Sequence, residues 1–241
     1  MEFEIKCAGD SAAVVIFGDK ISPEINQKVC LFQAALERDP IEGVTETVPA
    51  YCSLMVCYNP EIILWEEMYR RLSYVGTGLI SGGFSPGRLW EIPVWYGGEA
   101  GPDLSAVAQF HGLSPEEVIQ IHTSRDYLVY MLGFLPGFPY LGGMDQRIAA
   151  PRLDTPRVSI PAGSVGIAGA QTGVYPIASP GGWRLIGRTP IRFYDPERSQ
   201  PFLAQAGDHI RFYEIDRRTF LKMEEQTNHL LCQRCGEQEA L

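Results

Sequence analysis

Arginine dominates the charged side chains between residues 133 and 190, a stretch rich in glycine and proline. These charged residues are Asp145, Arg147, Arg152, Asp154, Arg157, Arg184 and Arg188, with no Lys and no Glu, although the whole chain carries a net charge of −9. A guanidinium group binds a carboxylate or phosphate through two parallel hydrogen bonds, and glycine lets a ligand approach backbone N–H groups. The stretch therefore predicts a binding site for an anion.

Four side chains are the strongest candidates to line that site. We expect Arg152, Arg157 and Arg184, together with Gln171, to bind a substrate carboxylate or to contact a partner protein. Arginines also tie loop carbonyl groups together, so a purely structural role stays open for them.

Two further residues are candidates for proton transfer. His122 is expected at the end of a helix beside the glycine-rich stretch, where the helix C-terminus favours the imidazolium and could tune a proton donor at the rim of the site. A helix cap or a surface histidine is the alternative. Asp145 could act as a base or as a partner of arginine.

Motifs for nucleotides and metals are missing or incomplete. A P-loop requires Gly-Lys, a pair that the chain lacks, and the glycines of 163–169 are followed by a segment that cannot begin a helix. His229, Cys232 and Cys235 offer three ligands where structural zinc takes four. We expect this chain to bind no cofactor and no metal.

The composition indicates a soluble globular protein. Of its 241 residues, 45% are hydrophobic, and no apolar run is long enough to span a membrane. The N-terminus lacks the basic and apolar regions of a signal peptide, so the six cysteines are expected to be reduced thiols in the cytoplasm. The acidic charge balance disfavours nucleic acid and anionic membranes as partners.

The N-terminal third predicts alternating strands and helices. Strands are expected at 2–7, 12–17, 44–50 and 52–58. A helix should begin at Ser22-Pro23, with Ser as N-cap, and a second helix is expected over 61–73 with Ile62, Met68 and Leu72 on its buried side. With the next strand at 89–96, this order is close to a split βαβ, ferredoxin-like domain. We place that domain at 1–84, before a glycine cluster.

The remainder predicts many short strands with little helix. A helix should run from Pro102 to near Gly112, and Ser114 with Glu117 forms a capping box for the next one. Strands are expected at 127–131, within the glycine- and proline-rich stretch, at 191–194 and at 209–215. This pattern favours a small closed barrel at 85–215, followed by a helix and tail at 216–241. The predicted fold class is α+β.

Four long segments resemble a known family. They are GGEAGPDLSAVAQFHGLSPEEVIQIH, GFLPGFPYLGGMD, PAGSVGIAGAQTGVYP and SPGGWRLIGRTP, which lie between residues 97 and 190. They are similar to the family of 5-oxoprolinase B subunits, which also includes the sporulation-kinase inhibitor KipI and allophanate hydrolase subunit 1 type proteins. The resemblance implies a ferredoxin-like N-terminal domain and a cyclophilin-like β-barrel.

The resemblance also implies a function. In this family the B subunit works with the A and C subunits to convert 5-oxo-L-proline to L-glutamate with ATP hydrolysis. The A subunit is then the expected site of ATP chemistry, the isolated chain is expected to be inactive, and a carboxylate substrate suits an arginine-rich site. Two alternatives remain: an inhibitor that binds a sensor histidine kinase, and a component of a urea or allophanate carboxyl-transfer system.

Overall fold

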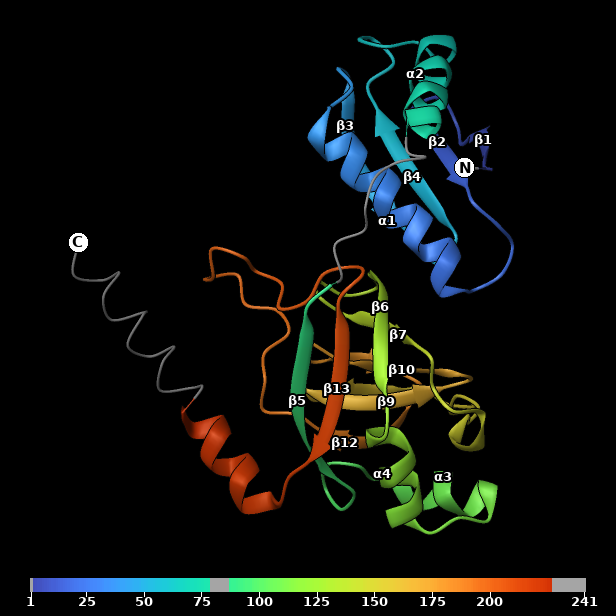
Figure 1. The fold of residues 1–241 in the computed structure, drawn as a ribbon. Coiled ribbons are helices and arrows are strands. Elements are labelled where there is room, and N and C mark those ends of the chain that lie inside the picture. Colours follow the sequence, from blue (N-terminus) through green and yellow to red (C-terminus); the bar gives the residue numbers. More distant parts are fainter. Residues whose placement is uncertain (1, 79–86, 227–241) are drawn as a thin grey trace, which may run out of the picture. The chain divides into compact units, whose positions relative to one another are not determined.

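The chain divides into two compact units, Met1–Gly87 and Arg88–Leu241, which we describe separately. A computed structural model describes residues 2–78 and 87–226 (Figure 1). The domain boundary predicted at 84/85 falls within 79–86, outside the described residues. Within the described ranges, no helix is both long enough and apolar enough to cross a membrane.

The N-terminal unit is a four-stranded sheet with two helices. Its elements are β1 (Glu4–Cys7), β2 (Ala12–Ile16), α1 (Pro23–Arg38), β3 (Val44–Pro49), β4 (Ser53–Tyr58) and α2 (Trp65–Gly78). The sheet order is β1-β2-β4-β3, and each neighbouring pair is antiparallel. Strand β4 therefore lies between β2 and β3, which α1 connects.

Alternating side chains of the two central strands build the core of this unit. Val15 of β2 and Leu54 of β4 are fully buried with Phe32 of α1 and Leu72 of α2. Both helices thus cover the same face of the sheet. The predicted Ser22 cap is confirmed, since its side chain accepts from the backbone N–H of the third residue after it.

The second helix begins later than predicted. Residues 60–63 form a turn, in which the Asn59 side chain accepts from the Glu61 backbone N–H, and α2 starts only at Trp65. The prediction that Ile62 is buried is therefore wrong, and its side chain is 58% exposed.

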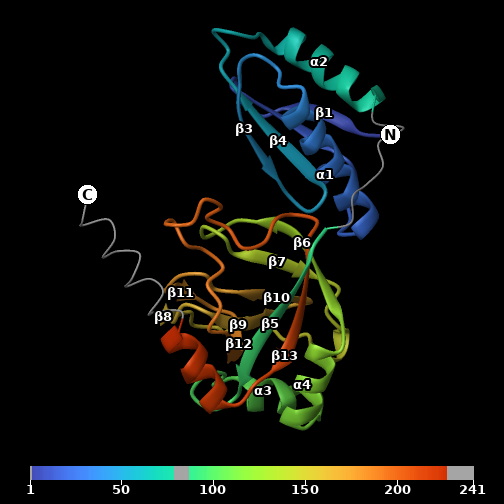
Figure 2. The ribbon, with the colours of Figure 1, turned by 60° about the vertical axis from the view of Figure 1, so that its left-hand side comes forward.

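The C-terminal unit is a closed barrel with strand order β10-β7-β6-β13-β5-β12-β9 (Figures 1 and 2). Its strands are β5 (Leu89–Tyr96), β6 (Asp126–Leu132), β7 (Pro139–Gly142), β9 (Ser164–Ala168), β10 (Gln171–Val174), β12 (Arg184–Arg188) and β13 (His209–Glu214). Strands β8 (Arg157–Ile160) and β11 (Ser179–Gly181) form a separate pair. The predicted barrel and the α+β class are confirmed.

The barrel closes between its first and last strands. β13 pairs with β5 in parallel, from His209 opposite Leu89 to Glu214 opposite Val94, and β13 also pairs with β6. Inward-facing apolar residues from every strand fill the interior, which leaves a packed core rather than a channel.

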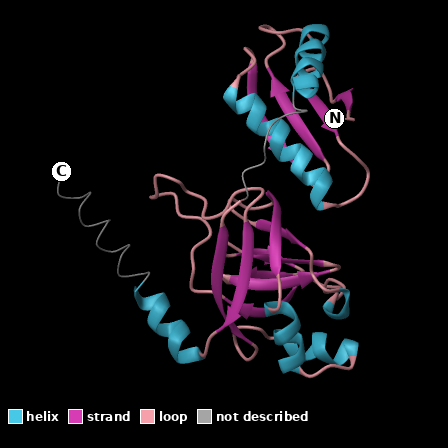
Figure 3. Ribbon diagram, viewed as in Figure 1, coloured by secondary structure: helices cyan, strands magenta, loops and turns pink. Residues whose placement is uncertain are grey.

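Two short helices lie side by side at one end of the barrel (Figure 3). α3 (Leu104–His111) ends at Gly112 with a positive φ of 66°, and α4 (Pro115–Thr123) begins with the predicted capping box of Ser114 and Glu117. The short element η2 (Gln146–Ile148) begins after Asp145.

The strand predicted at 191–194 is wrong. Instead, the Ile191 backbone N–H binds the Thr189 side chain, and only an isolated bridge joins Tyr194 to Phe202. A final helix covers 217–226, where Phe220 is 1% exposed and packs against Trp95 of β5.

Candidate functional site

Five aromatic rings form a continuous cluster on the barrel beside β7 and β12. Phe138 is its centre, with ring centroids 5.0 Å from Tyr140, 5.2 Å from Tyr175, 5.3 Å from Trp183 and 5.9 Å from Phe134. Phe138, Tyr175 and Trp183 are buried, Tyr140 is half-buried, and Phe134 is 65% exposed. We call this group the aromatic cluster.

Glycine makes the close packing of these rings possible. A Cβ atom at Gly181 would lie 2.5 Å from the Tyr175 hydroxyl oxygen, and one at Gly173 would lie 2.9 Å from Phe138 Cζ. Any larger residue at either position would displace a ring, so two glycines of the resembling segments are explained by packing.

Arg152 lies at the exposed edge of the aromatic cluster. Its side chain is exposed, and within the described residues no hydrogen bond or ion pair engages it. Burial raises the pKa of Tyr140 and Tyr175, while the positive charge of Arg152 acts in the opposite direction on both. Arg152 therefore places an exposed positive charge within electrostatic reach of phenols that stay protonated, an arrangement that suits an anionic ligand with an apolar body.

Arg184 and Gln171 lie close to the Arg152 loop in the fold. Arg184 Nε donates to the Pro151 carbonyl at 3.2 Å, and the Leu153 N–H donates to the Gly182 carbonyl at 2.7 Å. Gln171 is half-buried on β10, opposite Ala168 of β9. Arg184 thus holds the backbone that carries Arg152, while its role in binding stays a prediction.

Arg157 is committed to an internal ion pair. Its Nη2 lies 2.7 Å from Asp103 Oδ1, and Asp103 Oδ2 accepts from the Leu185 backbone N–H at 2.7 Å. Asp103 is 7% exposed, so the guanidinium neutralises a buried carboxylate. Arg157 is therefore held by an internal carboxylate, whereas the exposed Arg152 has no such partner among the described residues.

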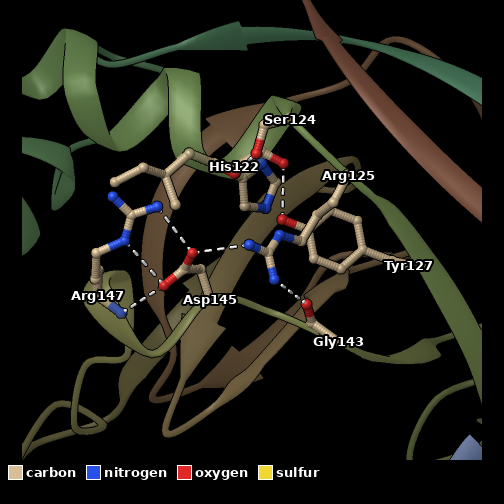
Figure 4. A network of polar contacts seen from close by, with 8 residues as sticks. His122, Ser124, Arg125, Tyr127, Gly143, Asp145 and Arg147 are labelled. Atoms are coloured by element: carbon tan, nitrogen blue, oxygen red, sulfur yellow. Dashed lines mark hydrogen bonds and ion pairs between the residues drawn. The ribbon is translucent and has the colours of Figure 1, made fainter.

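Asp145 sits between two arginines (Figure 4). Its Oδ2 lies 2.7 Å from Arg125 Nη2 and 2.9 Å from Arg147 Nη2, and Arg125 Nη1 also donates to the Gly143 carbonyl. Hydrogen bonds from the side chain and backbone of Arg147 lower the pKa of Asp145 to about 2. A carboxylate held in this way is a weak base, which favours the arginine-partner alternative.

His122 lies inside the barrel unit rather than at a rim. It is 0% exposed and stacks on Phe212 with ring centroids 4.8 Å apart. Its Nδ1 lies 2.7 Å from the Tyr96 hydroxyl, and its Nε2 lies 2.9 Å from Thr172 Oγ1.

The hydrogen bonds of His122 define its tautomer, and its burial defines its charge. Because Thr172 Oγ1 donates its proton to the Gly166 carbonyl at 3.1 Å, it must accept from His122 Nε2–H, and in the neutral ring Nδ1 then accepts from the Tyr96 hydroxyl. Burial lowers the pKa of His122 to about 3. The predicted imidazolium is therefore wrong, because desolvation outweighs the helix C-terminus. Its catalytic role stays a prediction.

Within the described part of the chain, no group of three His, Cys, Asp or Glu side chains could hold a metal ion. His229, Cys232 and Cys235 lie outside the described residues.

Comparison with known proteins identifies the family. The model of the carboxyltransferase domain, subdomains C and D, matches residues 3–204. The B subunit of 5-oxoprolinase from Bacillus subtilis is 45% identical over 95% of this chain and 99% of its own length. The chain belongs to the family of 5-oxoprolinase B subunits. Its Haemophilus influenzae relative of the same name is 45% identical over 78% of this chain and 87% of its own.

Several solved structures are similar to this chain. TTHA0988 superposes with a TM-score of 0.77 at 40% identity over 85% of this chain, which spans only 40% of that longer chain. PH0987 from Pyrococcus horikoshii is 50% identical, with a TM-score of 0.54 over 90% of this chain and 100% of its own. The urea carboxylase of Kluyveromyces lactis, at 19% identity and a TM-score of 0.73, shares the fold.

The sequence did not reveal which residues pair with the predicted site residues and so keep them from a ligand. Asp103 forms an ion pair with Arg157, and Arg125 forms one with Asp145. Both partners precede the glycine-rich stretch in the sequence. Tyr140 and Tyr175 lie inside the resembling segments, but the effect of the Arg152 charge on them depends on the folded structure.

Proposed function

We propose that the chain is the B subunit of a 5-oxoprolinase that, with the A and C subunits, converts 5-oxo-L-proline to L-glutamate with ATP hydrolysis. The observation that carries this proposal is the 45% identity to a 5-oxoprolinase B subunit over 99% of that protein's length. More distant relatives include a urea amidolyase, 30% identical over 53% of this chain, so the carboxyl-transfer alternative is not favoured.

In this proposal the chain contributes binding and assembly rather than a complete catalytic set. The buried neutral His122 and the doubly paired Asp145 support this proposal. The pKa values of both side chains are lowered, so neither is a good proton donor at neutral pH. ATP is used by the assembled complex, and this chain itself binds no cofactor.

Arg152 is the residue that we assign to the substrate carboxylate. The exposed guanidinium can form two hydrogen bonds to a carboxylate, while the half-buried Tyr140 ring supplies an apolar wall for a small cyclic amide. A contact with the C subunit at the same face is the alternative use of Arg152.

Three finer features belong to the same proposal. The N-terminal unit is ferredoxin-like, because β2, α1 and β3 enclose β4 as in a split βαβ unit, with β1 as the outer strand. The barrel is cyclophilin-like, and the protein acts in the cytoplasm.

Reconstitution tests the proposal. Purified chain is mixed with the A and C subunits, and glutamate release from 5-oxoproline is measured with and without ATP. We expect ATP-dependent release only from the mixture, and release without this chain would refute the proposal. Arg152→Lys should lower kcat/KM about 10- to 150-fold, because it keeps the charge but loses the fork. Arg38→Lys, an exposed control in the N-terminal unit, should not.

The kinase-inhibitor alternative stays a prediction. A pull-down with a sensor histidine kinase, with the A and C subunits as competitors, tests it directly.

A further inference from the structure

A groove of about 520 Å³ runs beside the helix of residues 217–226 and is separate from Arg152 and the aromatic cluster. Its walls are polar and apolar in similar measure, and they combine two arginines, one glutamate and one threonine with Pro, Ile, Ala and Tyr side chains. The residues that matter to the argument are Arg188, Arg192, Tyr194, Ile177, Ile191 and Glu224.

Arg188 is the best-defined cation of this groove. Its Nε donates to the Ala162 carbonyl at 2.9 Å, which fixes the plane of the guanidinium. Its Nη2 lies 3.0 Å from Glu224 Oε1, and its Cζ lies 5.4 Å from the centre of the Phe220 ring. The guanidinium is therefore positioned by the fold, and one edge of it already binds a carboxylate.

Glu224 is a replaceable partner of Arg188. Both side chains are 32% exposed, so water and solutes reach the pair, and an ion pair of this kind contributes little net stability. The carboxylate of Glu224 and that of a dissolved ligand would make the same hydrogen bonds to Nη2. Arg188 can hence exchange an internal carboxylate for an external one at small cost.

We propose that this groove binds small carboxylate ligands through Arg188, and that Glu224 is a built-in competitor for the same position. The volume is within the usual range for small-molecule sites, and the Pro and Ile side chains of the lining suit a ligand with a short hydrocarbon body. This site goes beyond the proposed function, because it needs neither of the other two subunits.

Ligand binding and helix docking are then coupled. The helix is held by Phe220 against Trp95, with ring centroids 5.5 Å apart, by Arg217 near Glu99 at 3.7 Å, and by Glu224 on Arg188. A ligand that takes Arg188 removes the last of these contacts. By thermodynamic reciprocity, the factor by which the ligand weakens the contact of Glu224 with Arg188 equals the factor by which loss of this contact strengthens ligand binding.

Calorimetric titration of the purified chain with glutarate tests the site. We expect glutarate to bind and neutral glutaramide not to bind. Glu224→Gln should tighten glutarate binding about two- to fivefold, which is what the loss of an exposed ion pair can release. Arg188→Lys should weaken it about tenfold or more.

The matched control is Glu225→Gln, which changes the net charge equally at an exposed neighbouring position. Glu225→Gln should leave the affinity close to that of the parent chain. In addition, glutarate should speed hydrogen exchange of backbone amides in 217–226 of the parent chain and less so in Glu224→Gln.

Three results would overturn the inference. If glutarate binds neither the parent chain nor Glu224→Gln, the proposed site does not exist. If Glu224→Gln and Glu225→Gln bind glutarate with equal affinity, Glu224 does not compete with the ligand. If a folded Arg188→Lys binds glutarate as the parent chain does, glutarate binds elsewhere. Tightening in Glu224→Gln cannot arise from misfolding, so the test stands even where Arg188→Lys is unstable.

Discussion

Acidification should destabilise the barrel through His122. The pKa of this side chain is about 3 in the folded protein, against an ordinary value of 6.5. Between these two values the unfolded chain binds a proton that the folded chain excludes, so the folding contribution of neutral His122 is complete above pH 6.5 and is lost as the pH falls. At pH 5 the loss is about 2 kcal/mol, a large part of a typical stability of about 5–15 kcal/mol.

His122→Gln removes the titration while keeping a polar side chain. It should be less stable than the parent chain at neutral pH, because Tyr96 and Thr172 lose well-aligned partners. The informative quantity is the change in unfolding free energy between pH 7 and pH 5, measured by urea denaturation and expected to shrink by about 2 kcal/mol. His209→Gln, at a half-buried strand position, is the control and should shrink it less.

An unaltered pH dependence in a folded His122→Gln would refute the reasoning. So would an NMR titration of the parent chain that shows His122 gaining its proton near pH 6.5. The same variant bears on catalysis: if His122 is structural, the acidic limb of the pH–rate profile of the assembled complex should stay in place.

Three further predictions concern packing and backbone. Arg157→Gln should lower the unfolding free energy by about 2–3 kcal/mol, because Asp103 stays buried without its cation, and an unchanged urea midpoint would contradict this. Gly181→Ala should cost about 1–3 kcal/mol in the same assay, since the added Cβ meets the Tyr175 hydroxyl at 2.5 Å; full stability would show that the cluster can relax. Phe134→Gly should be about 1 kcal/mol more stable than Phe134→Ala, because only Gly relieves the positive φ of 65°; equal stabilities would argue against strain there.

Local chemistry made the element ends predictable. Ser22 and the pair of Ser114 and Glu117 satisfy backbone donors within one turn, and Gly112 accepts a left-handed conformation, so neighbouring residues alone determine these ends. The short strands between Gly and Pro were also predictable, because these residues end strands through their own backbone preferences. At 191–194, however, the Thr189 hydroxyl takes the backbone donor that a strand would need.

The candidate site was predictable in composition but not in availability. The arginine-rich stretch was visible in the sequence, yet which of its arginines faces solvent depends on Asp103, 54 residues before Arg157. The charge of His122 likewise depends on its burial in the folded barrel, where it lies beside Tyr96 and Thr172. Such effects are set by tertiary burial, to which sequence periodicity is blind.

The parallel pairing of β5 with β13 has a consequence for biosynthesis. The strand that starts the barrel must wait for the strand that ends it, because Leu89 finds His209 only after the intervening chain has been made. The N-terminal unit has no such dependence, since its strands pair within residues 4–58. During synthesis that unit can fold first, while an unfinished barrel exposes the open edges of β5 and β6 to other nascent chains. Slow ribosomal passage through 89–209 should therefore favour aggregation, and chaperone binding should concentrate on this interval.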